Sequence, residues 1–223
     1  MVEGTGARKP YVIVISGSVA SGKSTLAARL SELLGGAPTL IFDHYTQYAE
    51  WPKNIEQWIE QGADPGYVRV PRLKEDLVSL LDGREIVYPV DDRVVRPAEY
   101  IIVEEPSGRE RQEIGGYVDL VVFVDVPQDV CVVRLVQRAM DMPVWEPGAF
   151  EHESREDVVR RLNAVATWIA HYMRVRSMYI KVSGLVKQRA DVVVDGLQAP
   201  DEIADEVLSV IRDRYTKGLP DGG

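Results

Sequence analysis

A short glycine-containing segment near the start of the chain has the residue types that bind phosphate. It reads Gly17-Ser18-Val19-Ala20-Ser21-Gly22-Lys23-Ser24-Thr25, and its first part fits the pattern G-x-x-x-x-G-K-[ST]. Glycines let backbone N–H groups curl around phosphate oxygens, and the N-terminus of a following helix attracts the same anion. Lys23 would reach the β- and γ-phosphates of a nucleotide, and the Ser24 hydroxyl would bind Mg²⁺. We therefore expect the whole segment to bind nucleotide, against the alternative of a Gly/Ser turn with an incidental lysine.

Two carboxylates follow apolar runs that are typical of buried strands. Asp43 comes directly after residues 39–42, and Glu104 ends the run 100–104. Asp43 could accept the proton of an acceptor hydroxyl or hold the metal, or it could merely begin a turn. We expect Glu104 to help bind Mg²⁺, against the alternative that it is a solvent-exposed residue at the end of a strand. Glu105 is the alternative candidate for this role, because a shift of one residue in the register of the predicted strand would exchange the positions of the two glutamates.

Arginines and aromatic residues complete the candidate site. Arg134 and Arg138 are four residues apart, so they share one face of a predicted helix. That helix leads into a Pro/Gly-interrupted segment at about 141–155, which has the length of a lid. Cations near a migrating phosphoryl group favour its transfer, so we expect Arg138 to act there unless this is a solvated face. Weaker candidates are Arg155, Arg160 and Arg161. The chain also has a cluster of aromatic residues. They could stack on a flat ring of the substrate, or they could pack as a cap over the sheet. They are Tyr45, Tyr48, Trp51, Trp58 and Tyr67.

The elements that must position these residues alternate between strand and helix. Apolar runs predict strands at 11–15, 39–42, 100–104, 120–126 and 192–194. Helical spacing predicts helices after the phosphate-binding segment and at 71–81, 128–142, from 154 toward 179, and 200–215, with a small hairpin over 85–95. The order predicts a five-stranded parallel sheet in a three-layer α/β/α P-loop nucleoside-triphosphate hydrolase fold. In such sheets ligands bind at the carboxyl ends of the strands, where the candidate residues lie.

Length and composition favour one domain over 1–223, with the core at about 10–140 and 185–215 and an acceptor-binding region at about 44–98. The net charge of −9 argues against a nucleic-acid partner. No apolar run is long enough to span a membrane, and we expect a cytoplasmic protein. The single cysteine, Cys131, lies among valines and predicts buried packing. A homo-oligomer is left open.

The chain resembles the uridine kinase and phosphoribulokinase group of P-loop kinases over nearly its whole length. The phosphate loop follows the group's G-x-[ST]-x-[ST]-G-K-[ST]-T pattern except at Val19 and Ala20. Phe42-Asp43-His44-Tyr45 is similar to its D-x-F-Y, and Ile101-Ile102-Val103-Glu104-Glu105 to its V-I-V-E-G. Similar segments also occur at 71–89, 119–125, 179–181 and 190–194. The resemblance implies ATP as donor, Mg²⁺ as cofactor, and Asp43 as base and metal contact.

Other family motifs are altered, and they concern the acceptor. The family motif D-H-P-x-A-[FL]-D contacts ribose, and Asp64-Pro65-Gly66-Tyr67 resembles it only weakly. Pro89-Val90-Asp91-Asp92 lacks the aromatic residue of the family motif P-x-Y-D. The lid pattern R-R-x-x-R-D is reduced to Arg134, Arg138 and Asp141. The candidate acceptor contacts are Tyr45, Asp64, Asp92 and Arg93.

These observations predict a kinase that transfers the γ-phosphoryl group of ATP to a hydroxyl of a small metabolite, such as a nucleoside or a sugar-like compound. Asp43, Lys23 and Arg138 are the expected catalytic residues, and Ser24, Asp43 and Glu104 the expected metal contacts. The alternatives are a non-catalytic nucleotide-binding regulator and a P-loop ATP-dependent ligase, which would phosphorylate a carboxylate. A GTPase is disfavoured because the chain has no N-K-x-D motif.

Overall fold

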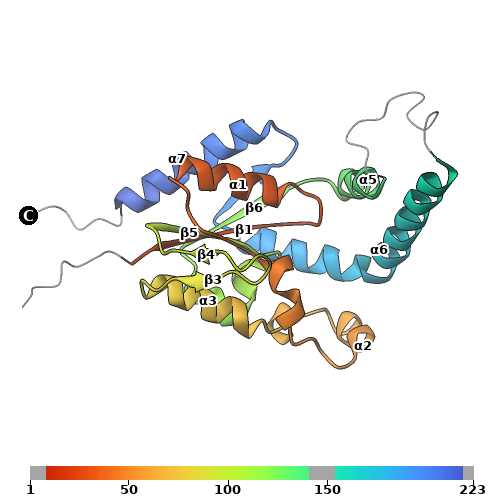
Figure 1. Ribbon diagram of the computed structural model, residues 1–223, viewed down its shortest axis with the longest axis horizontal. Helices are drawn as coiled ribbons and strands as arrows, with labels where there is room; N and C mark the ends of the chain where they lie inside the picture. The colour runs from red at the N-terminus through yellow and green to blue at the C-terminus, as the bar shows by residue number, and fades with distance from the viewer. Residues whose placement is uncertain (1–8, 141–153, 218–223) are drawn as a thin grey trace, which may run out of the picture.

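A central sheet of five parallel strands organises the molecule (Figure 1). The computed structural model describes residues 9–140 and 154–217. In space the strands follow the order β2-β5-β1-β6-β7. Their bounds are Tyr11–Gly17 for β1, Thr39–Ile41 for β2, Tyr100–Glu104 for β5, Leu120–Asp125 for β6 and Val192–Asp195 for β7. The antiparallel pair β3 (Ile86–Val87) and β4 (Val94–Val95) forms a separate ribbon. The predicted parallel sheet is therefore confirmed, and the predicted hairpin is present.

The β-branched runs form strands because both faces of the sheet are covered. Along β1, Val12 and Val14 pack into the core on one face, while Ile13 and Ile15 pack into the core on the other. All four side chains are fully buried. Alternate residues of a strand point to opposite faces, so a central strand between two helical layers must be apolar throughout.

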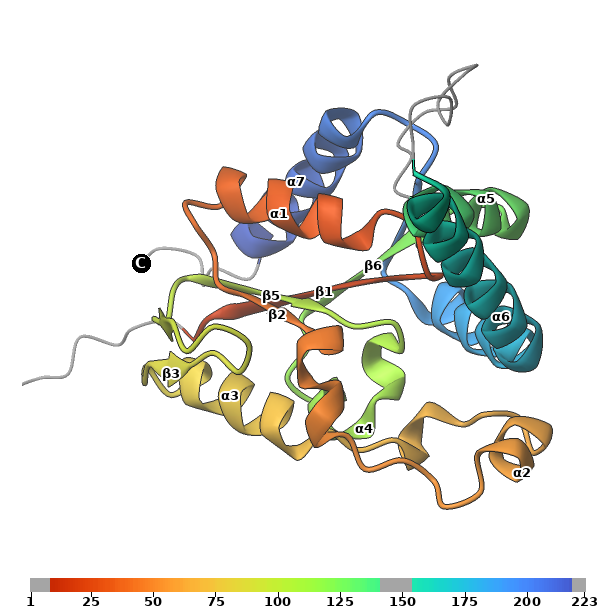
Figure 2. The same cartoon turned by 45° about the vertical axis from the view of Figure 1, so that its right-hand side comes forward.

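Helices cover the two faces and complete the predicted α/β/α layers (Figures 1 and 2). On one face lie α1 (Lys23–Leu33) and α7 (Pro200–Lys217), which share one hydrophobic core. The other face carries α3 (Pro71–Leu81) and the second part of α6 (Arg155–Arg189), which share the other core. The remaining helical segments are η1 (Phe42–Tyr48), α2 (Ile55–Glu60), η2 (Pro65–Tyr67), η3 (Gly108–Glu110), α4 (Gln112–Gly115) and α5 (Gln128–Ala139).

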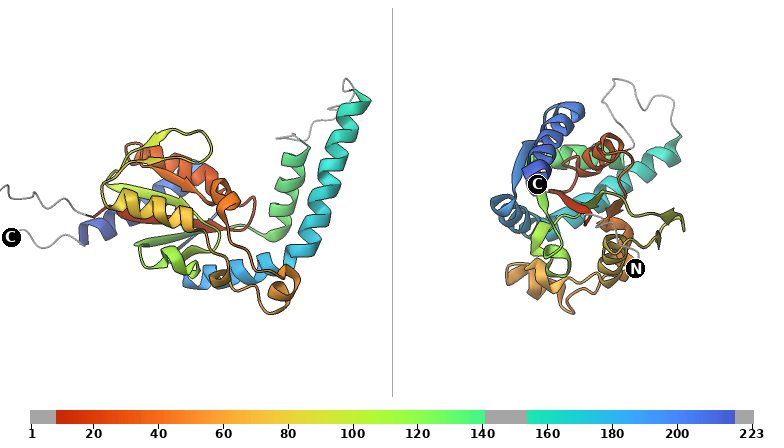
Figure 3. Two further views of the ribbon diagram at one scale, coloured as in Figure 1. Left: turned by 60° about the horizontal axis from the view of Figure 1, so that its bottom comes forward. Right: turned by 90° about the vertical axis from the view of Figure 1, so that its left-hand side faces the viewer.

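The helices α5 and α6 extend together beyond the sheet (Figure 3). Helix α6 begins where Ser154 accepts a hydrogen bond from the N–H of Asp157 at 3.1 Å, as its capping pattern predicts. Its first part lies beside α5, and the helix then turns back under the sheet. No helix within the described ranges 9–140 and 154–217 is long and apolar enough to cross a membrane.

Several element boundaries differ from the sequence prediction, most of them by one to three residues, and two of the differences have a clear physical reason. Strand β2 stops at Ile41, and Phe42 begins the 3-10 helix η1, because the last pairing of β2 joins Ile41 to Glu104 at the end of β5. Helix α6 continues beyond Tyr179 to Arg189, since Val182 and Val186 pack against the core under the sheet. Most of the predicted lid, residues 141–153, lies outside the described residues.

Candidate active site

The segment between β1 and α1 has a backbone that only a glycine-rich sequence adopts easily. Gly17 has φ +148° and Gly22 has φ +105°, while Ala20 accepts the left-handed value of +59°. A Cβ on Gly17 would meet the carbonyl oxygen of Val124 at 2.6 Å. Gly22 is the N-cap of α1, so the N–H groups of the first helical turn point into the loop. This geometry matches a cradle for phosphate oxygens.

Lys23 is buried at the start of α1 and directed toward the centre of the loop. Its Nζ donates a hydrogen bond to the carbonyl oxygen of Ser18 at 3.0 Å, and it lies 4.0 Å from Oε1 of Glu104. Burial lowers the pKa of the Lys23 ammonium, while the carboxylates of Glu104 and Asp43 act in the opposite direction. An anion bound in the loop would therefore stabilise the charged form of Lys23.

The two adjacent glutamates have different environments. Glu104 faces the loop, and its buried Oε2 has no hydrogen-bond partner. Glu105 is fully buried and forms an ion pair with Arg111, at 2.6 Å from Nε and 3.0 Å from Nη2. Glu104 is therefore directed toward Lys23 of the loop, whereas Glu105 is engaged in a buried ion pair.

Other unsatisfied polar atoms gather around the same loop. Within the described residues, Ser21 Oγ and Gln128 Oε1 are also buried without a partner. Buried polar atoms are rarely left unpaired in native proteins, so such a group suggests a site for a polar ligand. Ser18 is held from two sides, because its Oγ accepts from Gln128 Nε2 at 2.6 Å and lies 3.0 Å from Ser183 Oγ.

Asp43 and Ser24 are the exposed members of the group. The carboxylate of Asp43 is at the start of η1, and the Ser24 hydroxyl is in the first turn of α1. No cluster of three or more His, Cys, Asp or Glu side chains suited to a metal occurs in the described part of the chain. A Mg²⁺ ion that arrives with nucleotide phosphates needs only one or two protein carboxylates. The unpaired oxygen of Glu104, together with Asp43 in the same cavity, fits that requirement.

A cavity of about 510 Å³ brings three of the predicted residues together. Lys23, Asp43 and Glu104 line it beside the loop. Most of its remaining lining is apolar and comes from the segment after η1 and from α6. These apolar residues include Trp51, Ile55, Trp58, Val175, Met178, Tyr179 and Val182. We call this cavity the apolar pocket.

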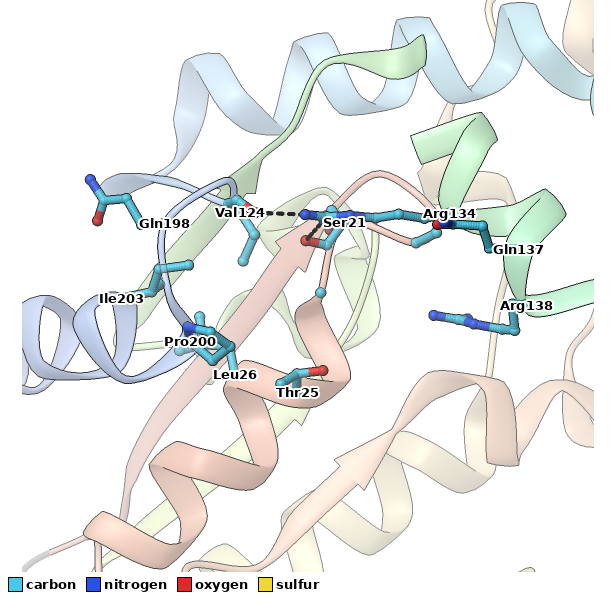
Figure 4. A pocket seen from close by; sticks show the side chains of 13 residues that line it. Ser21, Thr25, Leu26, Val124, Arg134, Gln137, Arg138, Gln198, Pro200 and Ile203 are labelled. Carbon is cyan, nitrogen blue, oxygen red and sulfur yellow. Dashed lines mark hydrogen bonds between the residues drawn. The ribbon is translucent and has the colours of Figure 1, made fainter. Parts of the chain in front are cut away.

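A second cavity of about 590 Å³ lies on the other side of the loop (Figure 4). We call it the α5 pocket, because Arg134, Gln137 and Arg138 enter it from α5. The guanidinium of Arg134 donates to the carbonyl oxygens of Ser21 at 3.3 Å and Gly196 at 3.2 Å. Both predicted arginines are therefore beside the loop, Arg134 as a brace and Arg138 as a lining residue.

The predicted acceptor contacts are not brought together. Tyr45, which belongs to η1, is fully buried, and its hydroxyl donates a hydrogen bond to Asp76 Oδ2 at 3.0 Å. The side chain therefore packs inside the protein. Asp64 caps η2 by accepting from the N–H of Gly66 at 2.8 Å. Asp92 and Arg93 lie at the β3–β4 turn, where Arg93 pairs with Asp91 at 2.6 Å. None of these four residues lines either pocket.

The aromatic cluster is divided, and some site residues were missed. Trp51 and Trp58 line the apolar pocket, whereas Tyr48 and Tyr67 are exposed. Sequence reasoning missed Gln128 and the lining residues of α6. Their helical spacing was visible, but which face of α6 meets the loop depends on contacts far apart in sequence.

Comparison with known proteins finds relatives over nearly the whole chain. A uridine kinase from Ligilactobacillus salivarius is 25% identical, and the alignment covers 92% of this chain and 96% of that enzyme. A uridine kinase from Streptococcus agalactiae is 23% identical, with 92% and 98% covered. Among solved structures, a gluconokinase from Sinorhizobium meliloti has a TM-score of 0.46 at 17% identity, with 96% and 100% covered. No family model matches the chain.

Proposed function

We propose that this uridine kinase-like chain transfers the γ-phosphoryl group of ATP to a hydroxyl of a small metabolite. The observation that carries the proposal is the shared pocket of Asp43, Lys23 and Glu104, which opens directly onto the phosphate loop. A carboxylate base, a buried cation and a metal-binding carboxylate are the groups that phosphoryl transfer to an alcohol requires. The similarity to uridine kinases supports the same reaction class.

Each residue has a distinct task in this reaction. Asp43 accepts or orients the hydroxyl proton of the acceptor, whose oxygen forms a bond to the γ-phosphorus. The bond between the γ-phosphorus and the bridging oxygen breaks, and its electron pair leaves with ADP. Lys23 and the N–H groups of the loop neutralise the negative charge on the phosphate oxygens. Arg138 adds a second cation from α5, which is the role that its place beside residues 20–25 supports.

The residues that would hold Mg²⁺ are Ser24, Glu104 and Asp43. When bound, the ion neutralises charge on the β- and γ-phosphates. Hard oxygen ligands of this kind suit Mg²⁺. The unpaired Glu104 Oε2 is the observation in favour of a metal-bound water or ion at this place.

The α5 pocket is our candidate site for the nucleoside part of ATP. It adjoins Ala20–Leu26 on the side of the loop opposite the apolar pocket, so donor and acceptor would meet at the loop from two sides. A non-catalytic regulator would need the donor site alone. The presence of a base candidate in a second cavity favours the kinase over the regulator. A ligase would use the same cavity for a carboxylate acceptor.

Substitution of Asp43 tests the proposal. Asp43→Asn keeps the shape of the side chain and removes its basicity, so we expect kcat to fall about 10²–10⁴-fold while the affinity for ATP without Mg²⁺ is unchanged. ADP release in the presence of candidate alcohols measures the first quantity, and titration with a non-hydrolysable ATP analogue measures the second. Asp82→Asn, at the exposed end of α3, is the matched control. Near-normal turnover of Asp43→Asn would exclude the assigned role.

A further inference from the structure

We propose that the acceptor is an alcohol whose hydroxyl is carried by an apolar body, such as an aromatic or terpenoid alcohol. The inference rests on the proposed kinase function and names its substrate class. It comes from the apolar pocket, whose polar residues are concentrated beside the phosphate loop and whose opposite wall is hydrophobic. At about 510 Å³ the cavity has the size of a site for a small organic molecule.

The wall of the pocket is a hydrophobic core in its own right. Trp58 from α2 and Val175 from α6 are buried in one cluster, and Met178, Tyr179 and Val182 pack against it. These side chains come from two elements, α2 and α6, that contact each other. A ligand that packs against this wall would exchange water for apolar contact, which favours a ligand with apolar surface.

Several polar groups of the pocket lining are already engaged within the protein. The indole N–H of Trp58 donates to the carbonyl oxygen of Asp64 at 3.0 Å. Thr46 Oγ1 donates to the carbonyl oxygen of Asp43 at 2.9 Å, and Ser183 is bonded to Ser18. Beyond the carboxylates at the loop end of the pocket, a polyhydroxylated acceptor would find few hydrogen-bonding groups, chiefly the Tyr179 hydroxyl and the exposed His171 ring. It would therefore lose more hydrogen bonds to water than it regains, and such losses disfavour binding.

The charges of the pocket argue in the same direction. Arg111 is buried, yet Glu105 neutralises it at 2.6 Å and the carbonyl oxygen of Val68 accepts another of its N–H groups at 2.6 Å. Its guanidinium also lies 4.6 Å from the ring centre of Phe42. Lys23 is directed toward the phosphate loop. The remaining basic side chain of the lining within the described residues, His171, is exposed on α6. Away from Lys23 at the phosphate-loop end, an acceptor bearing its own carboxylate or phosphate would thus find no buried Lys or Arg of the described lining without an ion-pair partner.

Asp43 fixes the orientation of the acceptor. It shares the pocket with Lys23 and Glu104, so the reacting hydroxyl must lie at that end. The apolar body then extends between α2 and α6, with the half-exposed Trp51 at the cavity margin. A single hydroxyl at one end of an apolar molecule satisfies both requirements.

The test compares apolar and polar alcohols as acceptors for the full-length protein. ADP release is measured with 2-phenylethanol and geraniol as apolar probes, and with uridine and D-ribose as polar probes. We expect kcat/KM for one of the apolar alcohols to exceed that for uridine and ribose at least tenfold. Quenching of tryptophan fluorescence gives the affinity of each probe independently of turnover, because Trp51 and Trp58 line the pocket.

A pair of variants locates the binding site. Met178→Gln keeps the length of a half-buried lining side chain and makes it polar, so we expect about a tenfold higher KM for the apolar alcohol with KM for ATP unchanged. Met173→Gln makes the same change at an exposed position of α6 outside the lining and should alter neither value. Val175→Thr is a second lining variant in case Met178→Gln folds poorly.

The outcomes separate the two proposals. Turnover of uridine or ribose with no response to apolar alcohols would overturn the acceptor class and keep the kinase. Binding of apolar alcohols without ADP release from any probe would keep the pocket and overturn the kinase. Equal KM values in wild type, Met178→Gln and Val175→Thr would show that the alcohol binds elsewhere and would also overturn this inference.

Discussion

At the scale of single residues, the site is defined by charges that lack full partners. Lys23 and Glu104 are both buried, but their closest approach is 4.0 Å, and one oxygen of Glu104 has no partner. Glu105, one position later, shares two short contacts with Arg111. A buried charge without a full set of hydrogen bonds is costly unless a ligand completes it. The contrast separates a residue kept for a ligand from one kept for the fold.

The two glutamates should therefore respond differently to the same substitution. We expect Glu104→Gln to lower kcat and to raise the Mg²⁺ concentration needed for half-maximal activity about 10–100-fold, because a metal-sphere carboxylate is lost. Glu105→Gln should instead lower the free energy of unfolding by about 3–5 kcal/mol, because it leaves Arg111 buried without its counter-charge. Mg²⁺ titrations of activity and denaturant unfolding of both variants measure these effects. An unchanged Mg²⁺ requirement in Glu104→Gln would remove that residue from the metal sphere.

At the scale of elements, the sequence predicted the features that depend on residues close to one another along the chain, namely the strands and the phosphate loop. The strands were recognisable because β-branched runs such as 11–15 have few other uses, and the loop because its pattern is local. The wall of the apolar pocket was not predictable. Val175 and Val182 lie at helical spacing on α6, yet their contact with α2 joins residues more than a hundred positions apart. The packing of Tyr45 could not be read from the sequence either, since its partner Asp76 belongs to α3.

The contact between η1 and α3 gives a prediction about Tyr45. Its hydroxyl donates to Asp76 Oδ2, while Arg72 Nε occupies Asp76 Oδ1 at 2.9 Å. We expect Tyr45→Phe to lower the free energy of unfolding by about 1–2 kcal/mol, because the buried Asp76 loses one of its two side-chain partners. The KM for ATP and the KM for the acceptor should both stay unchanged, since Tyr45 lines neither pocket. Denaturant unfolding and steady-state kinetics check the two halves of the prediction.

Tyr48→Phe is the control for this experiment. Tyr48 belongs to the same element but is exposed, so its substitution should change neither stability nor kinetics. A raised acceptor KM in Tyr45→Phe, absent from Tyr48→Phe, would restore Tyr45 as an acceptor contact.

At the scale of the whole molecule, the phosphate loop joins parts that are distant in the chain. It follows a central strand, and the two cavities adjoin it from opposite sides. Ser18 bonds to Gln128 of α5 and to Ser183 of α6, and Arg134 of α5 links Ser21 to Gly196 after β7. A ligand that orders the loop should therefore stabilise both helical layers and the extended pair α5 and α6 at once.

Binding of nucleotide should consequently raise the stability of the whole chain. At a concentration of a non-hydrolysable ATP analogue one hundred times its Kd, with Mg²⁺ present, we expect a gain in the free energy of unfolding of about 2.7 kcal/mol, or roughly 5–11 °C in Tm for a chain of this size.

Gly17→Ala should abolish this stabilisation by nucleotide. Its Cβ would meet Val124 O at 2.6 Å and Ser21 Oγ at 2.7 Å, which distorts the loop. Gly36→Ala is the matched control, because Gly36 also has a left-handed φ of +83° but nothing lies within 4 Å of its Cβ position. Thermal unfolding with and without the analogue should show both variants starting from a lower Tm than wild type, and only Gly36→Ala regaining the full increase with nucleotide. A full increase in Gly17→Ala would mean that the nucleotide phosphates bind away from this loop.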